Sequence, residues 1–230
     1  MKKYELTEET KVIDGHTLYR IRALKDFGYV KSGDLGGWVE SKENLSHDNK
    51  CWVSGDACIT GNARIYGNSY ICGDALVARD TLVFGNAHVC DNAHVTDNAH
   101  VCGDALVSDN AQVFGDTLVA GHALVFGDAH VFGNAYISGN VCVFGNARVS
   151  GNARIYGNAN IFDNACVYDN AGVAGNAQVH DNASVYNNSY VFDNARVSGH
   201  AHVFGHAHVY DDADISGDAH VSGKSKQDKL

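Results

Sequence analysis

The sequence of 230 residues contains no proline, one methionine and, after Glu43, no glutamate. Without proline every backbone amide can donate a hydrogen bond, as a continuous β-ladder requires. Residues that favour helices are concentrated near the N-terminus, whereas Gly, Asn and Asp, which favour turns, dominate the rest. This composition is not that of an ordinary globular protein.

Long apolar runs are also missing. No segment approaches the length that spans a bilayer, and the start, MKKYELTEET, has no apolar stretch behind its two lysines. We expect no secretory signal, no membrane contact and a cytoplasmic location.

Positive charge is scarce in the main part of the chain. Residues 51–222 carry seventeen Asp against five Arg, a net charge of −12, whereas the first fifty residues carry nine charges of each sign. Binding to a phosphate backbone depends on Lys and Arg, so direct nucleic-acid binding is not expected.

Seven cysteines occur without a CxxC spacing. An odd number without paired spacing favours reduced thiols over a disulfide framework or a zinc module. Cys72 and Cys90 are separated by a spacing that could place them on one face and allow a bridge, but in a reducing compartment we expect two thiols.

A six-residue repeat is the dominant positive feature. Val or Ile occupies every sixth position from Val53 to Val221, 29 positions without exception, and Ala lies two residues earlier in 23 of them. Two residues after each Val or Ile the chain places Gly, Asp, Asn187 or Arg79, followed mostly by Asn or Asp. Because Gly, Asn and Asp tolerate a positive φ, each unit predicts one short strand and one corner. Such units must stack to bury their apolar side.

This pattern is similar to the hexapeptide repeat of left-handed parallel β-helices, whose triangular coils each contain three hexads. The resemblance implies an all-β, single-stranded parallel β-helix of about ten coils, roughly 46 Å long at about 4.8 Å per coil.

The chain is expected to divide into three parts. Residues 1–50 predict a cap, with a β-hairpin around Asp14 and Gly15 followed by two imperfect hexads, 36–39 and 44–45, and an eight-residue step to Val53. Residues 51–223 form the solenoid, and 224–230 form a charged tail. The tail has no apolar stripe with which to cap the last coil, so we expect this end to take part in self-association.

The segments 24–27, 31–39, 44–45 and 51–53, above all Gly36-Gly-Trp-Val39, resemble the YdcK-like hexapeptide-repeat proteins of bacteria and phages. This resemblance implies the same fold and a possible phage-encoded origin, and it supplies no catalytic residues.

No catalytic residue is predicted. Acyl transfer on this fold uses a His in clefts between subunits, often shaped by loops, and the 29 repeats contain no insertion. An acyltransferase-like enzyme with a site between subunits remains the enzymatic alternative.

Thirteen His suggest metal binding, but consecutive hexads point to different sides, so His88, His94 and His100 should diverge. The candidate metal pair is His202 and His220, which are three hexads apart, against the simpler reading of a solvated His surface. Carboxylates are expected to stack in the pairs Asp56/Asp74, Asp91/Asp109, Asp163/Asp181 and Asp193/Asp211, either as cation ligands or as solvated corner residues. No cofactor is expected.

Large apolar side chains flank the buried positions and should face outward. On one predicted face the interface candidates fall in register: Leu106, Leu124, Phe126, Cys142, Phe144 and Phe162. They predict either a binding surface or stacked ladders that stabilise the rod.

The sequence thus predicts a non-enzymatic structural or interaction scaffold that forms a homo-oligomer and binds an unknown protein partner. A second alternative is an acidic decoy for nucleic-acid-binding proteins. Duplex DNA would place roughly 27 charges along a rod of ~46 Å, against a net 12 here.

Overall fold

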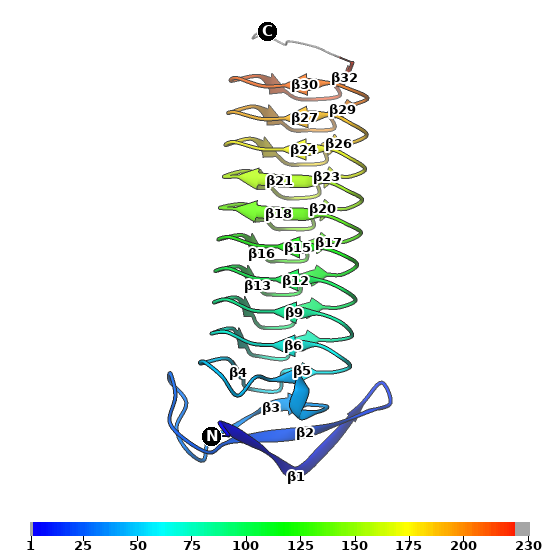
Figure 1. Ribbon diagram of the computed structural model, residues 1–230. Coiled ribbons are helices and arrows are strands. Elements are labelled where there is room, and N and C mark those ends of the chain that lie inside the picture. The colour runs from blue at the N-terminus through cyan, green and yellow to red at the C-terminus, as the bar shows by residue number, and fades with distance from the viewer. Residues whose placement is uncertain (1, 224–230) are drawn as a thin grey trace.

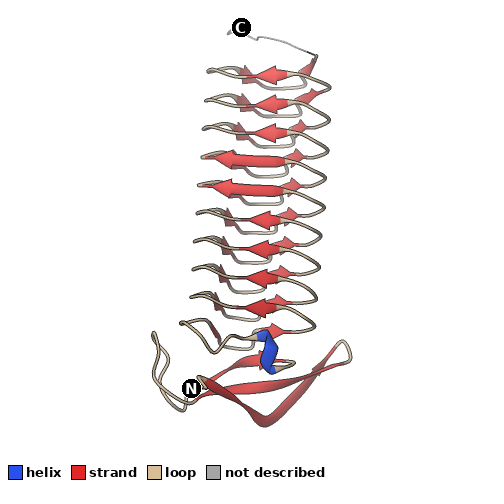
Figure 2. Ribbon diagram, in the orientation of Figure 1, coloured by secondary structure: helices blue, strands red, loops and turns tan. Residues whose placement is uncertain are grey.

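The computed structural model describes residues 2–223 and shows a β-solenoid whose coils stack along one axis from the N-terminal to the C-terminal end (Figure 1). The described chain is strand and turn apart from η1 (Lys42–Asn44), a short 3-10 turn drawn in blue in Figure 2. No helix among residues 2–223 has the length and apolar character needed to cross a membrane.

Three sheets form the sides of the rod. The thirteen-stranded sheet contains β1 (Tyr4–Ile13), β2 (His16–Ala23), β3 (Leu35–Val39), β5 (Cys58–Ile59), β8 (Leu76–Val77), β11 (His94–Val95), β14 (Gln112–Val113), β17 (His130–Val131), β20 (Arg148–Val149), β23 (Cys166–Val167), β26 (Ser184–Val185), β29 (His202–Phe204) and β32 (His220–Ser222). The ten-stranded sheet contains β4 (Trp52–Val53), β7 (Tyr70–Ile71), β10 (His88–Val89), β13 (Leu106–Val107), β16 (Leu124–Val125), β19 (Cys142–Val143), β22 (Asn160–Ile161), β25 (Gln178–Val179), β28 (Arg196–Val197) and β31 (Asp214–Ile215). The nine-stranded sheet contains β6 (Arg64–Ile65), β9 (Leu82–Val83), β12 (His100–Val101), β15 (Leu118–Val119), β18 (Tyr136–Gly139), β21 (Arg154–Gly157), β24 (Gly172–Val173), β27 (Tyr190–Val191) and β30 (His208–Val209).

The register confirms that each coil consists of three hexads and contributes one strand to each sheet. Val125 pairs in parallel with Val107 on one side and with Val143 on the other. Backbone amides of one coil donate to carbonyls of the next, as from Phe126 to Val143 at 3.0 Å and from Asp128 to Gly145 at 2.8 Å. The solenoid of about ten coils is therefore held by a continuous ladder, which the absence of proline permits.

The core is a column of Val, Ile and Ala. Ala123 and Val125 have no exposed surface, and the same holds for nearly every equivalent pair. The corners take positive φ at the expected positions, including Arg79 and Asn187 among the residues other than Gly. Gly121 shows why small residues are frequent there, since an added Cβ would lie 2.8 Å from the backbone nitrogen of Gly139 in the next coil.

The N-terminal segment covers the first coil. β1 and β2 form an antiparallel hairpin that turns at Asp14 and Gly15, and β3 pairs antiparallel with β2 but parallel with β5. Val39 pairs with Ile59, slightly more than three hexads further along, because of the eight-residue step before Val53. The expected charged tail, 224–230, lies outside the described residues.

Buried polar bonds attach this segment to the solenoid. The hydroxyl of Tyr4 donates to the Leu45 carbonyl at 2.9 Å, and Nζ of Lys3 donates to the Cys51 carbonyl at 2.8 Å. Burial lowers the pKa of Lys3 and raises the pKa of Tyr4.

Candidate functional site

Outward side chains stand in columns along each face, because residues three hexads apart pair in register. Each short strand contributes the residue before its buried Val or Ile, and the residue after it begins the corner. The size of the side chains above and below then decides how exposed each one is.

The six interface candidates are brought together on the ten-stranded side. Leu106, Leu124 and Cys142 are direct neighbours in register. Beside them, the ring of Phe144 stacks on Phe126 at 4.9 Å and on Phe162 at 5.0 Å, with interplanar angles of 1° and 3°. All six side chains are half-buried, because each column covers its own members. The ladder interpretation thus accounts for part of their apolar surface.

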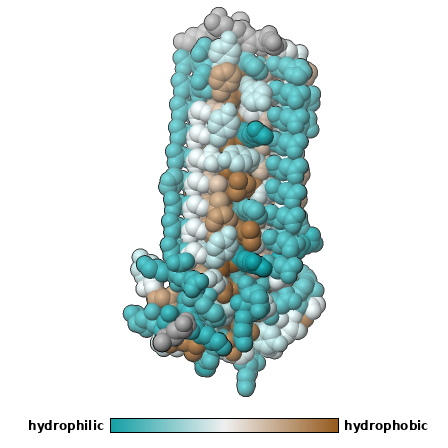
Figure 3. All heavy atoms as spheres, viewed as in Figure 1, coloured by the Kyte–Doolittle hydropathy of each residue, from teal (hydrophilic) through white to brown (hydrophobic). Residues whose placement is uncertain are grey.

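The nine-stranded sheet exposes more aromatic surface. In the repeat region of the described chain, the large apolar side chains with the highest exposure are Tyr66, Tyr136, Tyr156 and Tyr190, at 37, 40, 46 and 42%. Tyr66 directly follows a strand of this sheet, and the other three lie within its strands. Arg64 and Arg154 are exposed on the same sheet. In Figure 3, pale and brown side chains run along the middle of the rod between teal columns of corner residues.

This face was not predicted from the sequence, although the register of three hexads contains the signal. Tyr136 is followed in its column by Arg154, and Tyr156 lies between Ser138 and Ala174. Neither ring therefore has a second ring to stack on, whereas the Phe ladder does. Gly172 also leaves room, since an added Cβ there would lie 2.5 Å from Cδ1 of Tyr190, which folds over it.

The His side chains lie where the register of three hexads places them. His88, His94 and His100 lie on three different sheets. His202 and His220 stack with ring centroids 4.9 Å apart and planes 7° from parallel. Within residues 2–223 no third His, Cys or carboxylate joins this pair to make a group of three ligands.

Three of the four expected carboxylate pairs share one geometry. In each pair the backbone amide of the later Asp donates a hydrogen bond to Oδ2 of the Asp one coil earlier. The bonds run from Asp109 to Asp91 at 3.3 Å, from Asp181 to Asp163 at 3.3 Å, and from Asp211 to Asp193 at 3.4 Å. Asp56 differs, because its carboxylate accepts from Nε1 of Trp38 at 3.2 Å and lies 3.8 Å from Arg20. The paired Asp side chains therefore support the backbone of the next corner.

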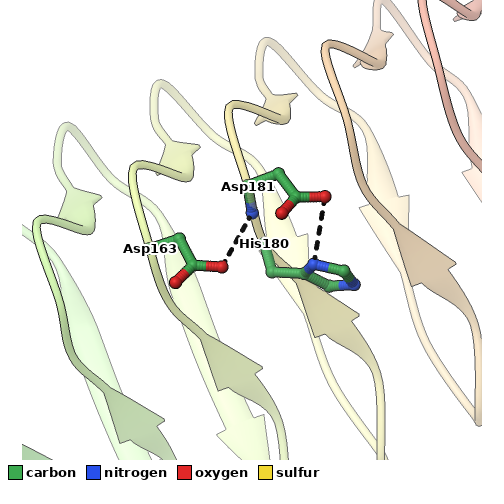
Figure 4. A group of neighbouring side chains, drawn as sticks. All are labelled: Asp163, His180 and Asp181. Atoms are coloured by element: carbon green, nitrogen blue, oxygen red, sulfur yellow. Dashed lines mark hydrogen bonds and ion pairs between the residues drawn. The ribbon is translucent and has the colours of Figure 1, made fainter.

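One of these pairs, Asp163 and Asp181, lies beside the imidazole of His180. Asp163, His180 and Asp181 bring one possible ligand atom each to within 4.8 Å of the others, and they are the one such group among the described residues (Figure 4). Nδ1 of His180 lies 3.3 Å from Oδ2 of Asp181. The Gly199 amide donates to Asp181 at 2.9 Å, and this bond, with the nearby His180, lowers the pKa of the Asp181 carboxyl.

Asparagine ladders run along the corners. Nδ2 of Asn140 donates to Oδ1 of Asn158, and the chain of bonds continues through Asn176 and Asn194 to Asp212, with distances of 2.9 to 3.1 Å. A second ladder links Asn134, Asn152, Asn170 and Asn188. They stabilise the rod in the way that stacked amides stabilise cross-β structures.

Two of the seven cysteines differ from the prediction of reduced thiols. Cys72 and Cys90 form a disulfide between neighbouring coils, with their Cα atoms 4.6 Å apart, where we expected two thiols. The register places these two residues side by side in neighbouring coils, which brings their sulfur atoms within bonding distance. The expectation of two thiols rested on a reducing compartment and not on this geometry. Burial raises the pKa of the five free thiols: Cys51, Cys58, Cys102, Cys142 and Cys166. Thiols of this kind are poor nucleophiles.

An open groove lies beside η1, with Glu43, Arg64 and Asp80 among its polar lining residues. None of its lining residues is His or Cys. The groove therefore lacks the side chains that most often provide general base or thiol chemistry.

A family model described as the YdcK β-solenoid repeat matches residues 142–157 and, in an overlapping register, 147–160. No curated protein matches the chain in sequence. The matched residues make up about one coil in the middle of the rod, which contains β19, β20 and β21.

Proposed function

We propose that this chain, a YdcK-like β-solenoid protein, is a non-enzymatic scaffold that associates with a second copy of itself through its nine-stranded face. The observation that carries the proposal is that the four most exposed tyrosines of the repeat region all lie on that face. Tyr66 stacks on Phe84 and Tyr190 contacts His208, whereas Tyr136 and Tyr156 have no ring beside them in their columns.

The residue types support an interface. Tyr and Arg are enriched where proteins bind one another, since they offer a broad apolar surface together with a polar group. Tyr136, Arg154 and Tyr156 lie on adjacent strands β18 and β21, so they form one patch on a rigid backbone. A rigid patch loses little conformational entropy on binding.

The dimensions also fit. Nine strands at about 4.8 Å and a side of six residues at about 3.3 Å each give a face of roughly 43 by 20 Å. That area is close to the ~800 Å² per partner that a standard interface buries. A second copy supplies a matching surface, because the acidic corners that flank the face can meet the exposed Arg64 and Arg154 of the other copy.

Sedimentation equilibrium of the full chain tests the proposal. Tyr136→His and Tyr156→Ser use residues that already occur in the same columns, His100 and Ser138, so the fold should persist. The double variant is expected to shift the association toward monomer by at least about tenfold in dissociation constant, the effect of losing about 1.4 kcal/mol.

A matched control lies on the ten-stranded side. Leu106→Asn places in that column the residue type found at Asn160 and should leave the association unchanged. A wild-type chain that stays monomeric at high concentration would refute the proposal, and so would an association that Leu106→Asn weakens and the tyrosine variants do not.

The enzymatic alternative predicts a different assembly. An acyltransferase-like protein would form a side-by-side trimer with His lining clefts between subunits, and coenzyme A would bind there. A decoy of nucleic-acid-binding proteins would instead remain monomeric and compete with DNA for a basic partner.

A further inference from the structure

The corner at Asp163, His180 and Asp181 differs from the other corners in its side chains and resembles them in its backbone. The pairs Asp91/Asp109 and Asp193/Asp211 make the same bond between carboxylate and amide. The residues that precede those aspartates are Cys90 and Ser108 in one pair, and Phe192 and Tyr210 in the other. Only the pair at Asp163 and Asp181 has an imidazole within reach among the described residues.

Stacking fixes the orientation of the imidazole. His180 continues the ladder of Phe126, Phe144 and Phe162, and its ring lies 4.7 Å from that of Phe162 at an angle of 8°. In this orientation Nδ1 points toward the corner and approaches Oδ2 of Asp181 (Figure 4). A ring held by packing loses less freedom when it binds a ligand.

Backbone bonds position the two carboxylates. Asp163 and Asp181 both have a φ of 56°, and Oδ2 of each accepts an amide hydrogen from the next coil, from Asp181 and Gly199 respectively. Both side chains are accessible to solvent and keep their second oxygen free of protein hydrogen bonds among the described residues. They are therefore oriented and still able to bind a cation.

The spacing suits a first-row transition metal. Zinc binds imidazole nitrogen and carboxylate oxygen at about 2.0–2.2 Å with tetrahedral geometry, so that neighbouring ligand atoms lie about 3.4 Å apart. The distance of 3.3 Å between Nδ1 of His180 and Oδ2 of Asp181 is close to this value, and Oδ2 keeps a second lone pair while it accepts from the Gly199 amide. The ligand atom of the exposed Asp163 side chain lies within 4.8 Å of the other two, so this side chain rotates toward them when the site is filled.

We propose that Asp163, His180 and Asp181 form a surface site for a divalent transition-metal ion such as Zn²⁺. One nitrogen and two oxygen ligands suit Zn²⁺ better than Ca²⁺, which prefers an all-oxygen set. Three protein ligands leave the fourth position to water or to a group from another molecule. The site is independent of the nine-stranded face.

Calorimetric titration of the metal-free full chain with Zn²⁺ at neutral pH tests the site. The expected result is one ion bound per chain. His180→Phe continues the ring ladder without the nitrogen, and Asp181→Asn places at that corner the residue found at Asn187, whose φ is 59°. Each variant is expected to lower the affinity by more than the ~10-fold that loss of even an outer-shell partner costs.

Two control variants distinguish this site from other metal-binding side chains on the surface. His202→Ser, which uses the residue type found at Ser184 in the same column, removes the stacked His pair. Asp109→Asn alters an equivalent carboxylate pair that lacks an imidazole. Both should bind Zn²⁺ as the wild type does. Absence of stoichiometric binding, unchanged affinity in His180→Phe and Asp181→Asn, or loss of binding in His202→Ser would overturn the proposal.

Replacement of Zn²⁺ by Co²⁺ gives a second readout that does not depend on heats of binding. The visible absorption of a tetrahedral Co²⁺ site should appear in the wild type and in His202→Ser and be absent from His180→Phe. Equal spectra in all three proteins would contradict the assignment of His180.

Discussion

Nδ2 of Asn158 donates a hydrogen bond to Oδ1 of Asn176, one coil further along the rod, at 3.0 Å. Asn158 also accepts from Asn140, so one side chain serves two neighbours. An aspartate can accept in such a ladder but cannot donate. Accordingly, the ladders end where the sequence changes to Asp, as at Asp116, Asp128 and Asp212.

Asn158→Asp should therefore destabilise the solenoid. The variant keeps the bond from Asn140 and loses the one to Asn176, at a cost of about 0.5–1.5 kcal/mol in free energy of unfolding. Urea unfolding measures this cost. Gln178→Glu, which adds the same charge on a strand outside the ladder, is the control and should cost less. Equal losses would show that charge, rather than the amide ladder, sets the effect.

Asp128→Asn should act in the opposite direction. The new amide could donate to Asn146 and join two ladders, Asn92 to Asp128 and Asn146 to Asn182, that are now separate. A gain of up to about 1 kcal/mol in stability is expected. Asp214→Asn removes a similar charge from a strand, and a gain of the same size there would contradict the explanation.

The close approach of coils at glycine corners predicts a second difference. Gly121→Ala combines a positive φ of 72° with a Cβ placed 2.8 Å from a backbone nitrogen, whereas Gly217→Ala, at a φ of 65°, has no atom within 4 Å. The φ cost of ~1 kcal/mol applies to both variants, and the clash should add about 1–3 kcal/mol to the first. Thermal and urea unfolding of both variants measure the difference. Similar losses of stability would contradict the explanation, because they would mean that neighbouring coils can move apart at no cost in free energy.

The disulfide between Cys72 and Cys90 should make stability depend on reductant. It closes a loop between residues with a sequence separation of 18, for which about 3 kcal/mol of stabilisation is expected. A reducing agent should lower the urea midpoint of the wild type but not that of the Cys72→Ser/Cys90→Ser variant. Serine suits this column, since Ser108 follows Cys90 in it. A wild-type midpoint indifferent to reductant would argue against the bond.

The hydroxyl of Tyr4 predicts a loss of stability at alkaline pH. Burial raises its pKa above the ordinary value of 10.0, so the unfolded chain releases this proton at a lower pH than the folded one. The contribution to stability is full below about pH 10 and falls as pH rises above it. Burial lowers the pKa of Lys3, so this residue changes the stability in the opposite direction. The free-energy cost of burying its charged ammonium group disappears as pH rises toward 10.5.

Comparison with Tyr4→Phe isolates the tyrosine, since Lys3 is common to both proteins. The stability difference between wild type and Tyr4→Phe should shrink from about pH 9 to about pH 11. A constant difference over that interval would contradict the assignment.

Much of the architecture follows from the repeat together with its resemblance to left-handed β-helices, which implies three hexads per coil. The spacing of three hexads predicted the stacks of Phe126 with Phe144 and of His202 with His220, because backbone register fixes which side chains are neighbours. The repeat also predicted where the corners lie, and in the structure the first residue of each corner takes the positive φ, Arg79 included.

The sites depend on features that the register does not fix. Whether a ring is exposed depends on the size of its neighbours, so Tyr156 between Ser138 and Ala174 was missed while the half-buried Phe144 was favoured. The contact of His180 with Asp181 depends on the side-chain rotamers of adjacent residues, and the hexad leaves those open.

Sedimentation equilibrium of the wild-type chain at about 0.1 M and about 1 M NaCl tests the proposed self-association most directly. The chain has a formal net charge of −10, so two copies repel at long range, and salt screens this repulsion. Salt also weakens the contacts of Arg64 and Arg154 with the acidic corners, but exposed ion pairs contribute little, and contacts between tyrosines stay intact. Association through the nine-stranded face should therefore strengthen as salt rises, and Tyr136→His/Tyr156→Ser should weaken it by at least about tenfold at both concentrations. An association that weakens with salt, or that is absent at both concentrations, would contradict it.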